Sequence, residues 1–192
     1  GGTINIFTKK GREGSHQDAA IRYGENNSQD VFYSVDGANE KNNYFVGFNY
    51  YKTDGISAMK NDDEKDSYKN NSLTTNYSYK ISENNIIENY LTLKESFMEY
   101  DEPTDGRDDT KNSSDNLEAH YIFKLVNTKD NFKNTFGFNK SATSRMVTEY
   151  DDDQKTYEGF KNMLTYLGEY NFNLDNKIIY GTDLEFFKAK YP

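Results

Sequence analysis

The sequence predicts an all-β protein, built as a meander of long antiparallel hairpins. Three observations support this fold class. Apolar and polar residues alternate with period two, turn-forming clusters recur at regular intervals, and no segment of comparable length has a helical period of 3.6. Aromatic residues make up 16% of the chain, yet only 34% is hydrophobic. Such a chain can make strands that are apolar on one face only.

Two kinds of connection alternate along the chain, and each kind recurs about every 45 residues. The tight turns are expected in Asn-rich clusters at 39–43, 82–85, 127–131 and 173–176. The longer connections are expected in acidic, hydrophilic stretches at 54–69, 99–114 and 145–156. This alternation predicts tight turns at one end of the hairpins and long loops at the other.

The segments between these breaks place apolar side chains at alternate positions. The predicted apolar positions are Tyr44, Val46, Phe48 and Tyr50; Leu73, Thr75, Tyr77 and Tyr79; Ile87, Leu91 and Leu93; Leu117, Ala119, Tyr121, Phe123 and Leu125; Phe132, Phe136 and Phe138; and Ile178, Tyr180, Leu184 and Phe186. Two residues fit poorly, because Asp36 falls beside Phe32 and Asn134 falls on an aromatic face. Either they lie near a membrane interface or the register differs there.

Strand length separates the kinds of β protein. The predicted strands run roughly 10–15 residues, whereas soluble strands are typically about 5–6 and a tilted strand crossing a bilayer needs about 9–11. The second face is too polar for a sandwich core and suits a water-filled or plugged lumen. We therefore expect a section of an antiparallel transmembrane β-barrel. The alternative is a soluble sandwich or adhesin with one wet face.

Several classes of function are disfavoured by composition and motifs. The chain has no Cys, which excludes disulfides, thiolate metal sites and thiol nucleophiles. Its 23 basic and 32 acidic residues give a net charge of -9, which disfavours nucleic acid as a partner. No nucleophile elbow, phosphate loop or zinc-protease motif is present, so we expect no enzymatic activity. His120 falls on the predicted lumen face with Glu118 and Lys124, where a polar lining role is expected.

The first residues, GGTINIFTKK, resemble the GGxINIxTK segment that ends the plug domain of TonB-dependent outer-membrane receptors. The matching positions are Gly1, Gly2, Ile4, Asn5 and Ile6. The resemblance implies two parts, the end of the plug at 1–11 and the N-terminal part of the barrel at 12–192. The chain lacks an initiator Met and a signal peptide, so we expect it to be a piece of a longer protein.

The family fold is a plugged barrel of 22 strands, of which this chain would supply about nine. The resemblance implies a location in the Gram-negative outer membrane, contact with its lipid and lipopolysaccharide, and coupling to the TonB complex through a plug region outside this chain. An open edge in lipid leaves backbone groups unpaired. We therefore expect the isolated chain to be insoluble or to need detergent, whereas a non-transporting surface or adhesion protein would fold in plain buffer.

Further segments resemble the cobalamin (vitamin B12) receptor branch of this family. They are TDGISA at 53–58, EKDSYKN at 64–70, and Tyr100 with Asp101. Ser67 stands where many relatives have Gly. The expected ligand is cobalamin or a related corrinoid, and the alternative within the family is a ferric siderophore or haem.

The acidic connections suggest calcium, which binds six to eight oxygen ligands, largely carboxylates. In cobalamin receptors the corresponding loops bind calcium, and matching positions here are Glu64, Asp66 and Asp101, followed by Asp108 and Asp109. The alternative is a solvated acidic loop, which is also expected of residues 151–153. No covalent cofactor is expected.

Overall fold

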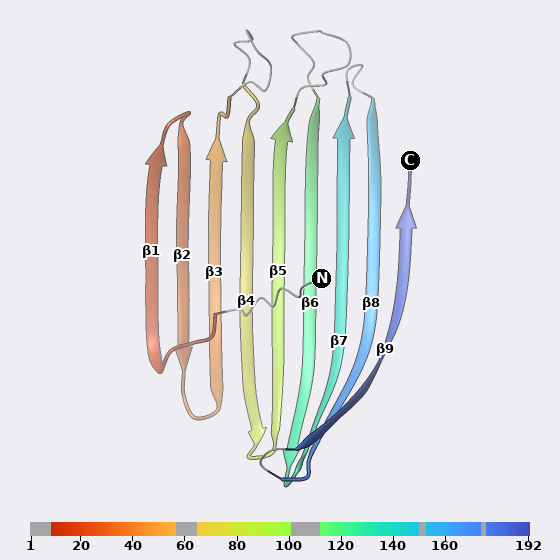
Figure 1. Ribbon diagram of the computed structural model, residues 1–192. Coiled ribbons are helices and arrows are strands. Elements are labelled where there is room, and N and C mark those ends of the chain that lie inside the picture. Colours follow the sequence, from red (N-terminus) through yellow and green to blue (C-terminus); the bar gives the residue numbers. More distant parts are fainter. Residues whose placement is uncertain (1–8, 57–64, 101–111, 150–152, 174–175) are drawn as a thin grey trace.

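The computed structural model describes residues 9–56, 65–100, 112–149, 153–173 and 176–192. Within these residues the chain forms nine strands and no helix. The strands are β1 (Gly14–Gly24), β2 (Ser28–Ala38), β3 (Asn42–Thr53), β4 (Tyr68–Ser82), β5 (Asn85–Glu99), β6 (Ser113–Lys129), β7 (Phe132–Thr148), β8 (Gln154–Asn171) and β9 (Lys177–Lys190). They form one sheet in sequence order with every neighbouring pair antiparallel, which confirms the predicted all-β meander of long hairpins (Figure 1).

The four predicted tight turns join β2 to β3, β4 to β5, β6 to β7 and β8 to β9, all at the lower end of Figure 1. Asn and Asp make these turns possible because their side chains bond nearby backbone and tolerate positive φ. The Asn39 side chain accepts hydrogen bonds from the backbone N–H groups of Lys41 (3.0 Å) and Asn42 (2.8 Å). Asp130 has a φ of 52°.

The longer connections join β3 to β4, β5 to β6 and β7 to β8 at the opposite end (Figure 1). The third is shorter than predicted, because β7 runs to Thr148 and β8 begins at Gln154. Most of the predicted loop at 145–156 is therefore strand. The short turn between β1 and β2 lies at the same end, with positive φ at Asn26 (52°) and Asn27 (53°).

The strand register assigns the residues to two faces, except at the irregularity between Lys80 and Ser82 at the end of β4. The polar face carries the even-numbered residues of β1, β2, β4, β5 and β6 and the odd-numbered residues of β3, β7, β8 and β9, since paired residues share a face. All the apolar positions predicted above lie on the other side, the apolar face. Asn134 lies there too, near the tight turns. Asp36 lies on the polar face, so the problem raised by its neighbours disappears.

Burial is inverted relative to an ordinary soluble domain. Among the described residues, only Phe45 and Val147 are buried apolar side chains, while six polar ones are buried: Ser34, Asp36, Asn76, Ser96, Asn112 and Ser114. Large apolar side chains on the apolar face are instead exposed, including Leu117 (57%) and Leu184 (54%). No helix in the described parts of the chain is long and apolar enough to cross a membrane.

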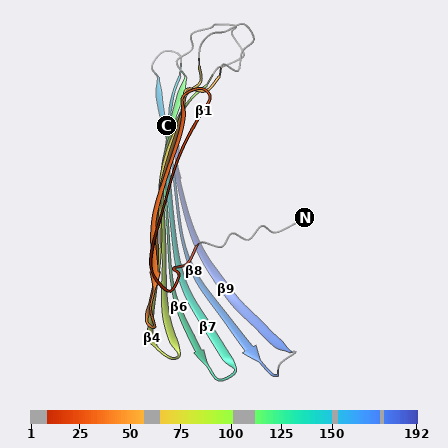
Figure 2. The same ribbon diagram turned by 90° about the vertical axis from the view of Figure 1, so that its left-hand side faces the viewer.

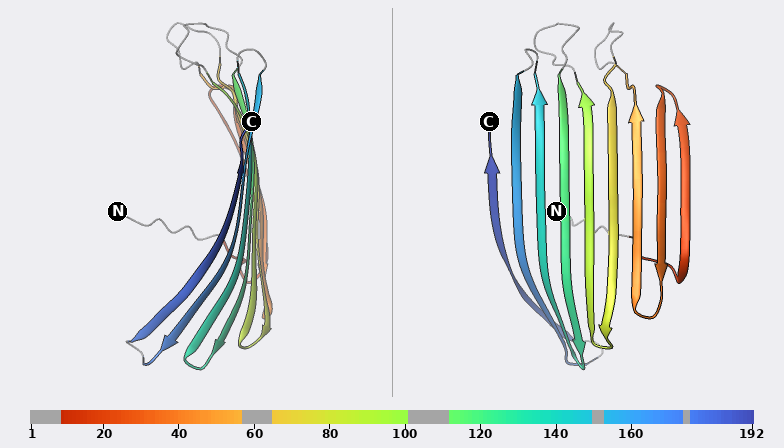
Figure 3. Two further views of the ribbon diagram at one scale, coloured as in Figure 1. Left: turned by 90° about the vertical axis from the view of Figure 1, so that its right-hand side faces the viewer. Right: turned by 180° about the vertical axis from the view of Figure 1, so that it is seen from behind.

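The sheet is twisted and bent. The lower halves of β7, β8 and β9 swing toward the side on which the chain enters β1, as both side views show (Figures 2 and 3). The polar face is therefore the inner side of the bend. Within the described residues β1 pairs only with β2 and β9 only with β8, so the sheet has two open edges.

Candidate functional site

Residues 9–12, which we call the N-terminal strap, cross the polar face just before β1. The Gly11 N–H donates to Asn43 Oδ1 (2.8 Å), and Asn43 Nδ2 donates back to the Gly11 carbonyl oxygen (2.9 Å). Asn76 Nδ2 donates to the Lys9 carbonyl oxygen (3.0 Å). An amide side chain can both donate and accept, so two Asn residues of β3 and β4 bond the strap as a neighbouring strand would.

Arg12 holds the strap to β2 through Asp36. The Arg12 backbone N–H donates to Asp36 Oδ2 (2.8 Å), Nε donates to the same oxygen (3.0 Å), and Nη2 donates to Oδ1 (2.6 Å). The Asp36 side chain is fully buried, whereas that of Arg12 is 45% exposed. A buried carboxylate is tolerated only when it is paired and hydrogen-bonded, and these three bonds meet that need.

Two further carboxylates receive the remaining positive charges of the strap. Asp18 Oδ2 accepts hydrogen bonds from Arg12 Nη2 (2.8 Å) and Lys9 Nζ (3.1 Å), and Lys10 Nζ lies 3.9 Å from Glu88 Oε1. The hydrogen bond to Asp36 is the main cause that raises the pKa of Arg12 above its ordinary value. The strap is thus a basic segment laid across acidic groups of β1, β2 and β5.

The strap lies close to the sheet because its residue 11 is a glycine. A Cβ atom on Gly11 would overlap the Gly37 carbonyl oxygen and lie 2.6 Å from the Tyr44 carbonyl oxygen. Just after the strap, a Cβ on Gly37 would lie 2.5 Å from the carbonyl oxygen of Gly14, at the start of β1. Only residues without a side chain permit this approach of backbone to backbone.

Farther along the polar face, charges pair across strands. Glu118 lies 3.5 Å from Lys94 Nζ and 3.8 Å from His120 Nε2, and His120 Nδ1 lies 3.0 Å from Ser141 Oγ. The Lys124 ammonium lies 5.5 Å from the centre of the Tyr90 ring. Glu118, His120 and Lys124 therefore share the polar face, where the sequence placed them.

Most of the metal-site residues predicted from the sequence lie outside the described residues: Glu64, Asp101, Asp108 and Asp109. Asp66 is described, and it lies two residues before β4. A Cβ on Gly55, whose φ is +73°, would overlap the Asp66 carbonyl oxygen, so the two ends of the β3–β4 connection touch. In the parts of the chain that the structure describes, no three or more His, Cys, Asp or Glu side chains form a metal-binding group.

The plug-end motif at Gly1, Gly2, Ile4, Asn5 and Ile6 also lies outside the described residues. The sequence did not single out Arg12, Asp18 or Asn43 as site residues. The sequence did mark Asp36 as unusual, because a carboxylate among apolar neighbours needs a partner. It did not identify that partner, because Arg12 lies in a segment without side-chain periodicity. Comparison with known proteins finds no family model and no curated protein that matches this chain.

Proposed function

We propose that this chain is a section of a transmembrane β-barrel, with the apolar face toward lipid and the polar face toward the interior. The observation that carries the proposal is the inverted burial. Large apolar side chains are exposed across the sheet, while Asp36, Asn76 and Ser114 are buried on the inner side of its bend. A sandwich would cover the apolar face with a second layer, and the described residues form no such layer.

The exposed apolar side chains form a continuous strip, which we call the apolar band. Counting positions on the apolar face, it consists of 44–50 in β3, 73–79 in β4, 87–93 in β5, 117–125 in β6, 132–138 in β7, 164–170 in β8 and 178–186 in β9. These stretches measure about 20–26 Å along the strands at about 3.3 Å per residue, comparable with the apolar band of about 25 Å in outer-membrane barrels. Charged residues follow toward the long-loop end, including Lys52, Glu95 and Asp115.

The apolar band runs diagonally across the hydrogen-bonded rows. One row links Tyr44 in β3 to Leu184 in β9 through six strand pairs. In β3 the centre of the band, position 47, lies three residues from this row toward the long-loop end. In β9 its centre, position 182, lies two residues from the row toward the tight-turn end. A drop of about five residues over six strand spacings corresponds to a strand tilt of about 30°, close to the 35–45° of membrane barrels.

Two Asn side chains within the apolar band each accept a hydrogen bond from a tyrosine of the next strand. Tyr121 donates to Asn89 Oδ1 (2.8 Å), and Tyr166 donates to Asn134 Oδ1 (2.9 Å). In lipid no water is present to satisfy such groups, so partners within the protein are required. This pattern favours lipid contact over a solvated face, where the pairing would be unnecessary.

Within this class, the chain fits part of a TonB-dependent outer-membrane receptor that captures and imports a scarce nutrient. The strap supports this assignment, because a chain leaving a plug must reach the first barrel strand from the interior, and residues 9–12 lie on the polar face. The division into a plug end at 1–11 and a barrel section at 12–192 follows from it. Partners would be the outer-membrane lipids and, through the plug, the TonB complex.

The proposed ligand is cobalamin or a related corrinoid, with a ferric siderophore or haem as the alternative. The proposed capture loops are the long connections, where Asp66 marks the entry to β4 and Glu64, Asp101, Asp108 and Asp109 would supply calcium ligands. Titration of the full-length parent with cyanocobalamin, in calcium and then in chelator, tests both points. Tight binding that weakens on chelation supports both; binding indifferent to calcium removes the metal role; no binding removes cobalamin.

Spin labels test the membrane orientation directly, because the chain has no Cys of its own. Leu91→Cys places a label on the apolar face, and Thr92→Cys places the matched control on the polar face of the same strand. In a full-length parent without other cysteines, reconstituted in vesicles, the label at 91 should collide with oxygen and the label at 92 with a water-soluble nickel complex. Water access at both positions would overturn the barrel and favour a β-rich surface protein.

A further inference from the structure

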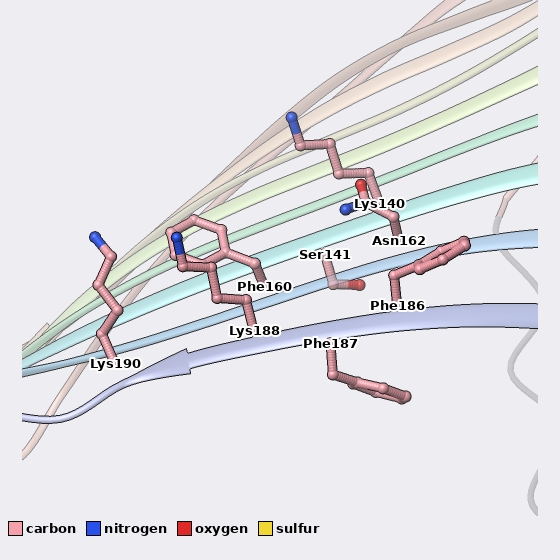
Figure 4. A pocket seen from close by; sticks show the side chains of 8 residues that line it. All are labelled: Lys140, Ser141, Phe160, Asn162, Phe186, Phe187, Lys188 and Lys190. Carbon is pink, nitrogen blue, oxygen red and sulfur yellow. The ribbon is translucent and has the colours of Figure 1, made fainter.

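A pocket of ≈ 390 Å³ opens on the apolar face of β7, β8 and β9, toward the long-loop end of these strands (Figure 4). Six of its lining residues belong to the apolar face: Lys140, Phe160, Asn162, Phe186, Lys188 and Lys190. Ser141 and Phe187 also line it, but their side chains point to the other side of the sheet (Figure 4). The pocket therefore combines three lysines with two aromatic rings beside the loop-side limit of the apolar band.

The lysines of this pocket are incompletely neutralised. Lys190 Nζ lies 2.5 Å from Glu158 Oε2, and it also lies 5.9 Å from the centre of the Phe160 ring. Lys140 and Lys188 form no ion pair with any residue that the structure describes. With Glu158 included, the pocket keeps an excess of positive charge, although the chain as a whole carries -9.

The position of the pocket relative to the apolar band sets its chemical surroundings. Lys140 follows Phe138 at the loop-side limit of the band in β7, and Lys188 follows Phe186 at that limit in β9. If the apolar face contacts lipid, these ammonium groups lie where hydrocarbon gives way to headgroups. Lysine side chains at this depth place their methylene stems along apolar surface and their charge at the interface.

We propose that this pocket binds the phosphate group of an anionic lipid headgroup, with Lys140 and Lys188 donating to the phosphate oxygens. Phosphate supplies several strong acceptor oxygens and a full negative charge, which matches two lysines that form no ion pair with the described residues. Phe160 and Phe186 cover the apolar part of the same lipid. The inference rests on the proposed function, since only a lipid-facing sheet presents headgroups at this level.

A second pocket on the same side gives the matched control. It is lined by Lys69, Asn71, Glu95, Phe97 and Asp115, among others, and its single lysine faces two carboxylates. It also lies toward the long-loop end and contains an aromatic ring, but its charge is unsuited to phosphate. Lys69→Gln therefore removes a lysine that lies two residues farther beyond the apolar band, without touching the proposed site.

The test measures lipid retention by the full-length parent in neutral detergent, by native mass spectrometry. Phosphatidylglycerol, zwitterionic phosphatidylcholine and inorganic phosphate are added separately to the parent, to the double variant Lys140→Gln/Lys188→Gln, and to Lys69→Gln. The parent and Lys69→Gln should retain phosphatidylglycerol, and the double variant should bind it at least about tenfold more weakly. Lys140→Arg/Lys188→Arg should restore binding, because it restores both charges.

Two results would overturn the proposal. Equal retention of phosphatidylglycerol by the parent and the double variant would remove the two lysines from any lipid site. Binding of inorganic phosphate that equals binding of the lipid would make the pocket a free-anion site. The spin-label experiment separates this failure from failure of the barrel itself, because a label at 91 that meets only water removes the lipid-facing sheet as a whole.

Discussion

Arg12 and Asp36 form an ion pair on the polar face in which three hydrogen bonds converge on one buried carboxylate. One bond comes from the backbone of Arg12, so the pair fixes the path of the chain as well as a side chain. Asp36 in turn lies in β2, beside the edge strand β1. The pair therefore ties the strap to the first hairpin of the sheet.

Removing the Arg12 side chain should release the strap. In Arg12→Ala the buried Asp36 loses two of its three hydrogen bonds, and Asp18 loses a partner. We expect backbone amides at 9–12 to exchange hydrogen about tenfold faster or more, measured by mass spectrometry on the full-length parent. The control is Arg22→Ala, which removes an ion pair of the same length, 2.6 Å, from a residue that is 69% exposed. Equal protection in both variants would contradict the anchoring role.

A side chain at position 11 should also displace the strap. Gly11→Ala places a methyl group against the carbonyl oxygens of Gly37 and Tyr44, and overpacking of this kind costs about 1–3 kcal/mol. Gly24→Ala is the matched control, because its Cβ would meet only Ser28 Cβ at 3.6 Å. Thermal unfolding in detergent should show a lower transition temperature for the first variant and little change for the second. A Gly11→Ala protein as stable as Gly24→Ala would show that the strap does not lie against β2.

Phe45 lies on the polar face beneath the strap and is 6% exposed. The Lys9 ammonium lies 5.6 Å from the centre of its ring. Phe45→Ala should lower the free energy of unfolding by about 3 kcal/mol, because it leaves a cavity under the strap. Phe48→Ala changes the same residue type in the same strand, but on the apolar face, where Phe48 is 42% exposed. Chemical denaturation should show a smaller loss there; the reverse order would contradict the assignment of faces.

A charge in the middle of the apolar band tests lipid contact energetically. Leu91→Lys should destabilise the parent protein in vesicles by about 2–4 kcal/mol, because a lysine near the bilayer midplane is poorly solvated. Thr74→Lys places the same charge on the polar face of the neighbouring strand and should cost much less. Folding equilibria in lipid vesicles measure both variants. Equal costs would count against a bilayer on the apolar side.

The alternation of side chains was enough to predict the all-β meander and its two faces, because a strand exposes successive residues to opposite sides. The Asn-rich clusters predicted the tight turns. The prediction of strand ends from this alternation failed where strands are polar on both faces. β7 and β8 extend to Thr148 and from Gln154, and these strand ends read as loop in the sequence. β8 also carries Met163 and Leu167 on its polar face, which blurs the period of two.

The site was harder to predict than the fold. Arg12 and Asp36 are 24 residues apart, and Asn76 meets Lys9 across 67 residues. Such pairs depend on the path of the strap over the sheet, which neither propensity nor periodicity determines. The lysines of the β7–β9 pocket are likewise brought together only by the register of three strands.

The diagonal of the apolar band also determines how a closed wall would wind. A stagger of about five residues over six strand pairs, continued around about 22 strands, would return a row of hydrogen-bonded partners to β1 roughly 18 residues from its start. β1 has only 11 residues, so no row could close on itself. Each row of hydrogen-bonded partners would instead follow a helical path from one rim of the barrel to the other. A force on one strand would therefore be distributed over many neighbouring strands.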